Sequence, residues 1–191
     1  MTFQPMALVL LHHPVIDRHG AVVTSAVTNL DIHDLARLVT TYGLCRYYLV
    51  TPADEQRQLI ERIITHWREG AGARFNPDRQ QAFAAIRVVS SLQEVLTDWQ
   101  RLTGQCGRII LTGARHEQGT PPAAVRQMAK AESLLLVFGT GHGLAPSLYT
   151  PDRPCLAAIR PGDYNHLSVR TAAAIVLDRL LGDNGRILPL P

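Results

Sequence analysis

The 191-residue sequence has few of the features that mark disulfide-rich, zinc-binding or membrane-spanning proteins. It contains only three cysteines, which lie far apart and form no CxxC pair. This argues against a structural zinc site and favours a reducing compartment. No apolar run is long enough to cross a bilayer, and the chain does not begin with a signal-peptide pattern. We therefore expect a cytoplasmic protein with no membrane partner and no metal.

Dedicated nucleic-acid-binding patterns are lacking too. The chain has no arginine-rich tail, no block of lysines and no aromatic strand motif of the kind that stacks on RNA bases. The formal net charge of +3 is compatible with an anionic partner but does not identify one. Any contact with a nucleic acid would therefore have to use a surface assembled by folding.

What the sequence does contain is a regular alternation of apolar runs and amphipathic stretches. This alternation predicts one α/β domain over residues 1–191, with a mostly parallel sheet and helices on both faces. A polar, glycine-bearing excursion is expected at residues 70–79. The expected strands lie at residues 7–12, 45–50, 86–90, 108–112, 134–138 and 155–159. The expected helices lie at residues 32–42, 53–69, 91–102, from 120 onward and 168–181.

Three glycines after the most apolar run form the clearest candidate for a ligand site. The loop at residues 138–144 reads FGTGHGL, and such a loop lets a ligand lie against backbone N–H and C=O groups. A second loop, at residues 159–168, precedes an alanine-rich helix that Ser168 is expected to cap. Since both loops follow strands of the expected sheet, we expect them to form opposite walls of one small-molecule pocket.

Known nucleotide-binding motifs fit this loop poorly. A Rossmann fingerprint needs its helix to begin inside the glycine motif and an acidic residue about 20 positions later. Here Pro146 follows closely, and the next strand ends in Arg160-Pro161-Gly162; the chain also has no Gly-Lys-Ser/Thr of a phosphate loop. The residues alone indicate a ligand-binding α/β domain. A turn without a ligand and a flavodoxin-like or Rossmann-like enzyme are the alternatives.

Three segments, in order along the chain, resemble the SPOUT superfamily of S-adenosylmethionine (SAM)-dependent RNA methyltransferases. Residues 138–144 resemble its second motif. Residues 159–175, with His166-Leu167-Ser168-Val169 at the centre, resemble its third. Residues 31–37, followed by Tyr42-Gly43, are similar to the first motif of its ribose-methylating branch. The resemblance covers nearly the whole chain and is closest to a small bacterial subfamily of predicted RNA methyltransferases.

The resemblance implies an α/β fold with a C-terminal trefoil knot, SAM as cofactor, an RNA substrate such as tRNA or rRNA, and a homodimer. Apolar side chains of the last helix, Ile175, Val176 and Leu180, are expected to contribute to the contact with the second subunit. The cofactor would be held largely by backbone. The residues expected to bind it are Thr112, Gly113, Phe138, Gly139, Thr140, Gly141, Gly143, Leu144, Ile159, Pro161, Gly162, Tyr164, His166, Leu167 and Ser168.

Arg37 is the main catalytic candidate implied by the resemblance. It would bind a substrate phosphate or lie beside the nucleophile. Asp31 and Asp163 are candidate bases or orienting groups. Asp31 also fits a helix N-cap, and Asp163 also fits the turn at residues 161–163.

Further candidates for RNA contact are two histidines at the end of the first expected strand and five basic side chains near the expected cleft. These are His12, His13, Arg115, Arg126, Lys130, Arg160 and Arg170. No spacing among the histidines suggests a metal site.

Two residues depart from the pattern of the ribose-methylating branch. Asp31 stands where that branch has asparagine, and His166 stands where it has another residue. The methylated atom, on a base or on a ribose, is therefore left open. The alternative function is a non-catalytic, cofactor- or RNA-binding knotted domain that acts as a partner module.

Overall fold

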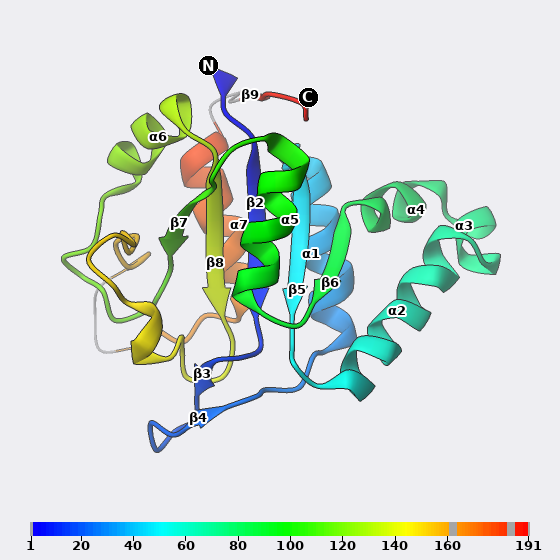
Figure 1. Ribbon diagram of the computed structural model, residues 1–191, viewed down its shortest axis with the longest axis horizontal. Helices are drawn as coiled ribbons and strands as arrows, with labels where there is room; N and C mark the ends of the chain where they lie inside the picture. The colour runs from blue at the N-terminus through cyan, green and yellow to red at the C-terminus, as the bar shows by residue number, and fades with distance from the viewer. Residues whose placement is uncertain (1, 161–163, 183–185, 191) are drawn as a thin grey trace.

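The computed structural model describes residues 2–160, 164–182 and 186–190, and its centre is a five-stranded parallel sheet (Figure 1). The strand order is β6-β5-β2-β8-β7, and β2 pairs with β5 on one side and β8 on the other. Every residue of β2 is buried, because both faces of the sheet are covered, and a strand in that position needs apolar residues throughout. The strands are β2 (Met6–Leu11), β5 (Arg46–Val50), β6 (Ile86–Val89), β7 (Arg108–Leu111) and β8 (Leu134–Gly139).

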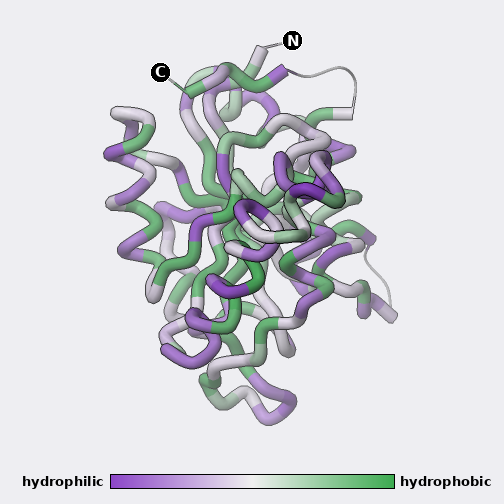
Figure 2. The backbone as a smooth tube through the Cα atoms, turned by 90° about the vertical axis from the view of Figure 1, so that its right-hand side faces the viewer, coloured by the Kyte–Doolittle hydropathy of each residue, from purple (hydrophilic) through white to green (hydrophobic). Residues whose placement is uncertain are grey.

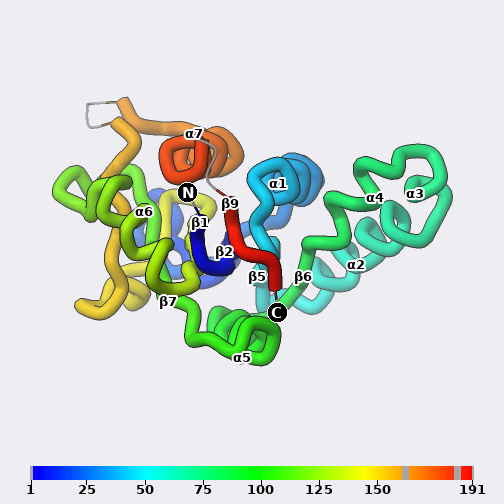
Figure 3. Tube along the Cα trace, turned by 90° about the horizontal axis from the view of Figure 1, so that it is seen from above, coloured from blue at the N-terminus to red at the C-terminus, as the bar shows by residue number. Residues whose placement is uncertain are grey.

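Helices cover both faces of this sheet, as the sequence predicts. Helices α1 (Asn29–Thr41), α6 (Pro122–Ala131) and α7 (Val169–Leu181) contribute to one apolar cluster, and α5 (Leu92–Thr103) contributes to another. Figure 3 shows α1 and α7 on one side of the strands and α5 on the other. Side chains of one strand point alternately to the two faces, so Leu10 of β2 packs in the first cluster and Val9 in the second.

The residues expected as an exposed excursion, 70–79, instead form helix α3 (Ala71–Phe75) and the start of α4 (Pro77–Ala84). Together with α2 (Asp54–Arg68) they project beyond the edge strand β6 (Figures 1 and 3). The Asn76 side chain accepts a hydrogen bond from the Arg79 N–H and caps α4, while Pro77 occupies its first turn. The polar composition concealed these helices because few of their residues face inward.

Two further expectations are corrected. Residues 155–159 do not form a strand of the sheet; they make isolated bridges, Leu111 with Cys155 and Thr120 with Leu156. The helix expected from residue 120 onward begins two residues later, at Pro122, and Pro121 precedes it. Thr120 instead pairs with the passing segment.

Short strands outside the central sheet tie down the rest of the chain. β1 (Thr2–Phe3) pairs in parallel with β9 (Arg186–Ile187), and β3 (Val15–Ile16) pairs with β4 (Val22–Val23) in a hairpin. A single 3-10 turn, η1, covers Pro146–Leu148. Among the helices of the described residues, none has the length and apolarity needed to cross a bilayer.

Candidate functional site

Three loops meet at the carboxyl end of the sheet, where parallel α/β proteins bind their ligands. They are residues 112–120 after β7, residues 140–145 after β8, and residues 155–160 and 164–168 before α7. The backbone N–H of Ala158 donates to the His116 carbonyl at 2.9 Å, and the Asn165 side chain donates to the Ala114 carbonyl at 2.8 Å. The first and third loops therefore lie against each other.

The glycine loop after β8 is hydrogen-bonded to the β3–β4 hairpin. Gly141 and Gly143 have φ angles of 60° and 120°, which side-chain-bearing residues rarely adopt. The His142 N–H donates to the Ile16 carbonyl and the Ile16 N–H donates to the Gly143 carbonyl, each at 2.9 Å. A Cβ atom on Gly141 would lie 2.9 Å from the Ile16 carbonyl oxygen. The glycines are thus needed for this pairing.

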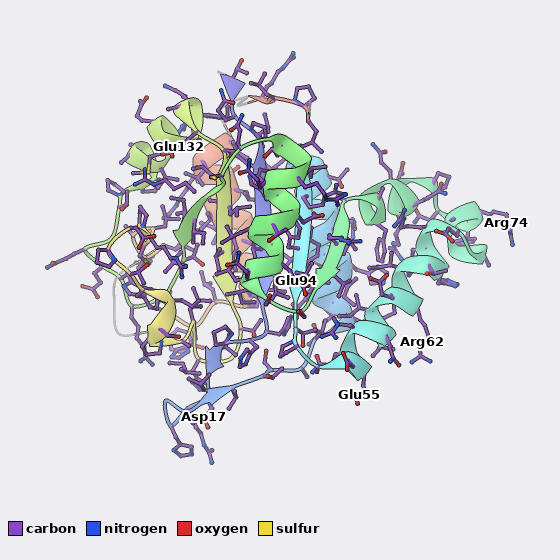
Figure 4. The ribbon with its side chains drawn as sticks, viewed as in Figure 1. Asp17, Glu55, Arg62, Arg74, Glu94 and Glu132 are labelled. Carbon is purple, nitrogen blue, oxygen red and sulfur yellow. The ribbon has the colours of Figure 1, made fainter. Side chains whose placement is uncertain are left out.

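The hairpin has little signature in the sequence, because its strands are only two residues long. It extends past the carboxyl edge of the sheet in Figure 1, and its tip is hydrophilic in Figure 2. Asp17, labelled in Figure 4, organises the turn by accepting hydrogen bonds from the His19 and Ala21 N–H groups. Such an aspartate followed by Gly20 is the one local signal that could have revealed it.

A segment of the third loop runs between the two ends of the first loop. The Leu156 N–H donates to the Leu111 carbonyl at 2.8 Å, and the Thr120 N–H donates to the Cys155 carbonyl at 2.7 Å. A Cβ atom on Gly119 would lie 2.7 Å from both the Ala157 nitrogen and the Cys155 carbonyl oxygen. Only glycine fits against this backbone without moving it.

A cavity of about 600 Å³ opens beside this crossing and is lined by residues 115–120 and Cys155. Burial raises the pKa of the Cys155 thiol to about 11. The nearby Tyr149, whose ring lies 4.7 Å from that of His116, has its pKa raised to about 12, mainly by burial. Both groups are therefore neutral near pH 7. The cavity has a volume typical of small-molecule sites and is bounded largely by one backbone loop.

The expected cofactor-binding residues are divided between these loops. Phe138 is buried in the core and can offer a ligand only its backbone. Tyr164, His166, Leu167 and Ser168 are exposed, and Ser168 caps α7 as predicted, accepting a hydrogen bond from the Thr171 N–H at 3.2 Å. Three expected residues, Pro161, Gly162 and the catalytic candidate Asp163, lie outside the described residues.

Asp31 and Arg37 are not brought together. They lie six residues apart on α1, so they face different directions; Asp31 is buried and Arg37 is exposed. The interpretation of Asp31 as the helix N-cap is wrong, because Thr28 holds that position and accepts a hydrogen bond from the Asp31 N–H. The Thr28 hydroxyl in turn donates to the Asp31 carboxylate at 2.6 Å.

The Asp31 carboxylate also forms an ion pair with Arg170 of α7, at 2.7 Å. The side chains of Asp31 and Arg170 are 6% and 29% exposed, and Arg170 reaches Asp34 as well, at 3.3 Å. Position 31, where the ribose-methylating branch has asparagine, thus carries an aspartate whose charge is neutralised by the partly buried Arg170. Arg170 joins two helices here and is not the free phosphate-binding group that we expected.

His12 belongs to a polar network that sequence reasoning missed. It is fully buried, so it does not contact RNA as expected; its Nδ1 lies 2.9 Å from the Ser25 hydroxyl. Ser25 shares a hydrogen bond with the hydroxyl of Thr140 in the glycine loop, which also donates to the Leu11 carbonyl at 3.1 Å. Burial lowers the His12 pKa to about 4, against the opposing effect of Asp31.

The apolar surface expected on α7 is mostly not available to a second subunit. Val176 and Leu180 are buried in the core, and Ile175 is half-buried. Exposed apolar side chains occur instead near the starts of α1 and α7, at Leu30 (58% exposed) and Leu167 (45% exposed).

Comparison with known proteins places these features in a family. The model of a family described as SAM-dependent RNA methyltransferase matches residues 5–182. A tRNA (guanine-N(1)-)-methyltransferase of Oleidesulfovibrio alaskensis is 45% identical over 175 residues, which are 91% of this chain and 41% of that protein. The chain therefore spans about two fifths of that relative. An uncharacterized protein of Aquifex aeolicus is 37% identical over 185 residues, 93% of this chain and 88% of that one.

The fold is shared with solved methyltransferase structures. The SpoU methyltransferase AviRb of Streptomyces viridochromogenes, in complex with AdoMet, superposes with a TM-score of 0.60 at 17% identity, covering 96% of this chain and 60% of that one. At this identity the likeness concerns the fold alone. Together with the family match, it confirms the superfamily resemblance drawn from the three sequence segments.

Proposed function

This chain belongs to the family of SAM-dependent RNA methyltransferases, and we propose that it transfers a methyl group from SAM to a nucleotide of tRNA or rRNA. The main support is the contact between the loop at residues 112–120 and residues 155–158 at the carboxyl end of the sheet, where Gly119 lies against the backbone of that segment. The name of the Oleidesulfovibrio relative favours tRNA. Because the chain spans only part of that protein, the target atom, on a base or a ribose, stays open.

The cavity of about 600 Å³ beside residues 115–120 has the volume of a small-molecule site, which supports a cofactor of the size of SAM. When bound, SAM supplies a methyl group on a sulfonium, which is already a good leaving group. The chain therefore has to bind and orient, and we propose that the backbones of residues 112–120, 139–144 and 164–168 hold the cofactor, with Ile159 beside them. Pro161 and Gly162 are also proposed to contact the cofactor, as the sequence predicts. The neutral Cys155 thiol adds no negative charge to the cavity wall.

Arg37 is proposed to hold the RNA. Its exposed guanidinium on α1 can bind a phosphate through paired hydrogen bonds. Asp31 is better suited to orienting than to accepting a proton, since Thr28 and Arg170 already occupy its carboxylate. Asp163 keeps its predicted role as a candidate base.

Calorimetric titration and a methylation assay test this function together. SAM and S-adenosylhomocysteine should bind at micromolar concentration, and flavin and nicotinamide nucleotides should not. Arg37→Ala should lower methylation of unmodified tRNA and rRNA transcripts by about 100-fold while the affinity for SAM stays within about twofold, because only a substrate contact is removed. Arg101→Ala, on α5 across the sheet, is the matched control.

The outcomes separate the alternatives. Binding of SAM without methylation of any RNA would favour the non-catalytic partner module. Binding of flavin or nicotinamide without SAM would support a different nucleotide-using enzyme.

We further propose that residues 1–191 act as one knotted domain in a cytoplasmic homodimer. The passage of residues 154–158 between Leu111 and Thr120 supports the knot, and an experimental chain trace through this region would test it. Leu30 and Leu167 support the dimer, because the Asp31–Arg170 ion pair brings their two helix starts together. Sedimentation at micromolar concentration should give twice the 21.1 kDa chain mass; a monomer would contradict the dimer.

A further inference from the structure

The projecting element formed by α2, α3 and α4 ends in an exposed aromatic ring. Phe75, the last residue of α3, is 87% exposed. Arg74 lies at the far end of the same element and Arg62 on its helix α2 (Figure 4), where Arg62 lines a cavity with Val88 of β6. We call Arg62, His66, Arg74 and Phe75 the α3 tip. An exposed aromatic ring beside cationic side chains marks a surface that can bind a partner.

The base of the tip is well packed. Gly72 of α3 is buried, and a Cβ atom there would lie 2.7 Å from the Trp67 ring and 2.9 Å from the His66 ring. The Arg79 guanidinium lies 4.5 Å from the centroid of the Trp67 ring on the same base. Helix α3 is thus seated directly on α2, and Phe75 is presented by a fixed support.

The outer part of this element, residues 62–79, has an excess of positive charge, whereas α2 to α4 as a whole, residues 54–84, has five arginines and five acidic residues. Residues 62–79 contain four arginines and two acidic residues, Glu69 and Asp78. Arg79 is engaged with Trp67, whereas Arg62 and Arg74 form no ion pair with any residue in the described ranges. Both are exposed, so a phosphate can reach them.

We propose that the α3 tip binds a single-stranded loop of the RNA substrate, with an unpaired base stacked on Phe75 and neighbouring phosphates on Arg74 and Arg62. Stacking on an aromatic side chain and pairing of arginine with phosphate are the two interactions by which proteins hold unpaired RNA. The inference rests on the proposed function and adds to it a place of substrate contact outside the cofactor loops. The sequence has no linear RNA-binding motif, so a contact with RNA requires a surface assembled by folding. The α3 tip would provide such a surface.

Fluorescence anisotropy with a labelled, unmodified tRNA transcript tests the proposal. Phe75→Ala and Phe75→Leu should each weaken binding about tenfold, since leucine keeps the apolar surface but has no π face, and Phe75→Trp should bind like the original chain. Arg74→Ala should weaken binding severalfold and reduce the slope of log K against log salt by about one. The affinity for SAM and the melting temperature should not change. Leu59→Ala, an exposed apolar residue on α2, is the matched control.

Each other outcome has a definite meaning. If the original chain binds and methylates RNA but the Phe75 variants bind RNA equally well, the tip is not an RNA contact and the proposed function stands. If Phe75→Ala changes only self-association in sedimentation, the tip is a protein contact and the inference is overturned. If the original chain neither binds nor methylates RNA, the proposed function itself fails.

Discussion

Arg170→Leu should destabilise the protein by about 3 kcal/mol, because it leaves the buried Asp31 carboxylate without its counter-charge. The Asp31 side chain is 6% exposed, and once Arg170 is removed it retains the Thr28 hydroxyl as its hydrogen-bond donor. Asp31→Asn should cost less, about 1 to 2 kcal/mol, since Arg170 is partly exposed and still has Asp34 at 3.3 Å. The larger effect therefore comes from removing the cation.

The double variant provides the decisive comparison. Asp31→Asn combined with Arg170→Leu should be more stable than Arg170→Leu alone, because no unpaired charge is left buried. Urea denaturation at pH 7 measures all four proteins. Arg101→Leu, which removes a 76% exposed partner of Asp98, should change stability by less than about 1 kcal/mol. Additive effects of the two substitutions would show that Asp31 and Arg170 do not act as a pair.

Acidification should weaken the fold through His12, by about 3 kcal/mol once the pH has fallen from above 6.5 to below 4. The His12 pKa is lowered from 6.5 in the unfolded chain to about 4 in the folded one, chiefly by burial. Between these values the unfolded chain binds a proton that the folded chain does not, so lowering the pH favours unfolding. Above pH 6.5 the imidazole is neutral in both states and adds no pH dependence.

The variant His12→Asn isolates this effect. Asparagine has a polar atom near the position of Nδ1, so it can keep the hydrogen bond to Ser25, and it does not titrate. Between pH 7 and pH 5 the original chain should lose about 2 kcal/mol more stability in urea denaturation than this variant loses. Equal slopes for the original chain and His12→Asn would exclude His12 as the source.

The sequence predicts the central sheet and its main helices because their signals are local. The apolar runs of β2 and β8 are continuous, and Ser91, at the start of the helix expected at residues 91–102, caps α5 by accepting a hydrogen bond from the Glu94 N–H. Helix α3 has no such pattern, since its buried residues are Gly72 and Ala73, which carry little apolar surface. The same reason hid the hairpin, whose strands are too short to show alternation.

Of the candidate site, only the backbone loops could be predicted from the sequence. The glycines after β8 and the Ser168 cap are visible along the chain, because each acts within a few residues of itself. The ion pair of Asp31 with Arg170 joins residues 139 positions apart, and Ser25 meets Thr140 across 115. No periodicity encodes such partnerships, so the sequence alone does not show that Arg170 pairs with Asp31 or that Thr28 caps the helix in its place.

The parallel pairing of β1 with β9 fixes where additional protein can be attached. It places both ends of the chain side by side at the amino edge of the sheet, whereas the cofactor loops occupy the carboxyl edge (Figure 1). A domain fused at either terminus, or a purification tag, would emerge on the far side from the cavity.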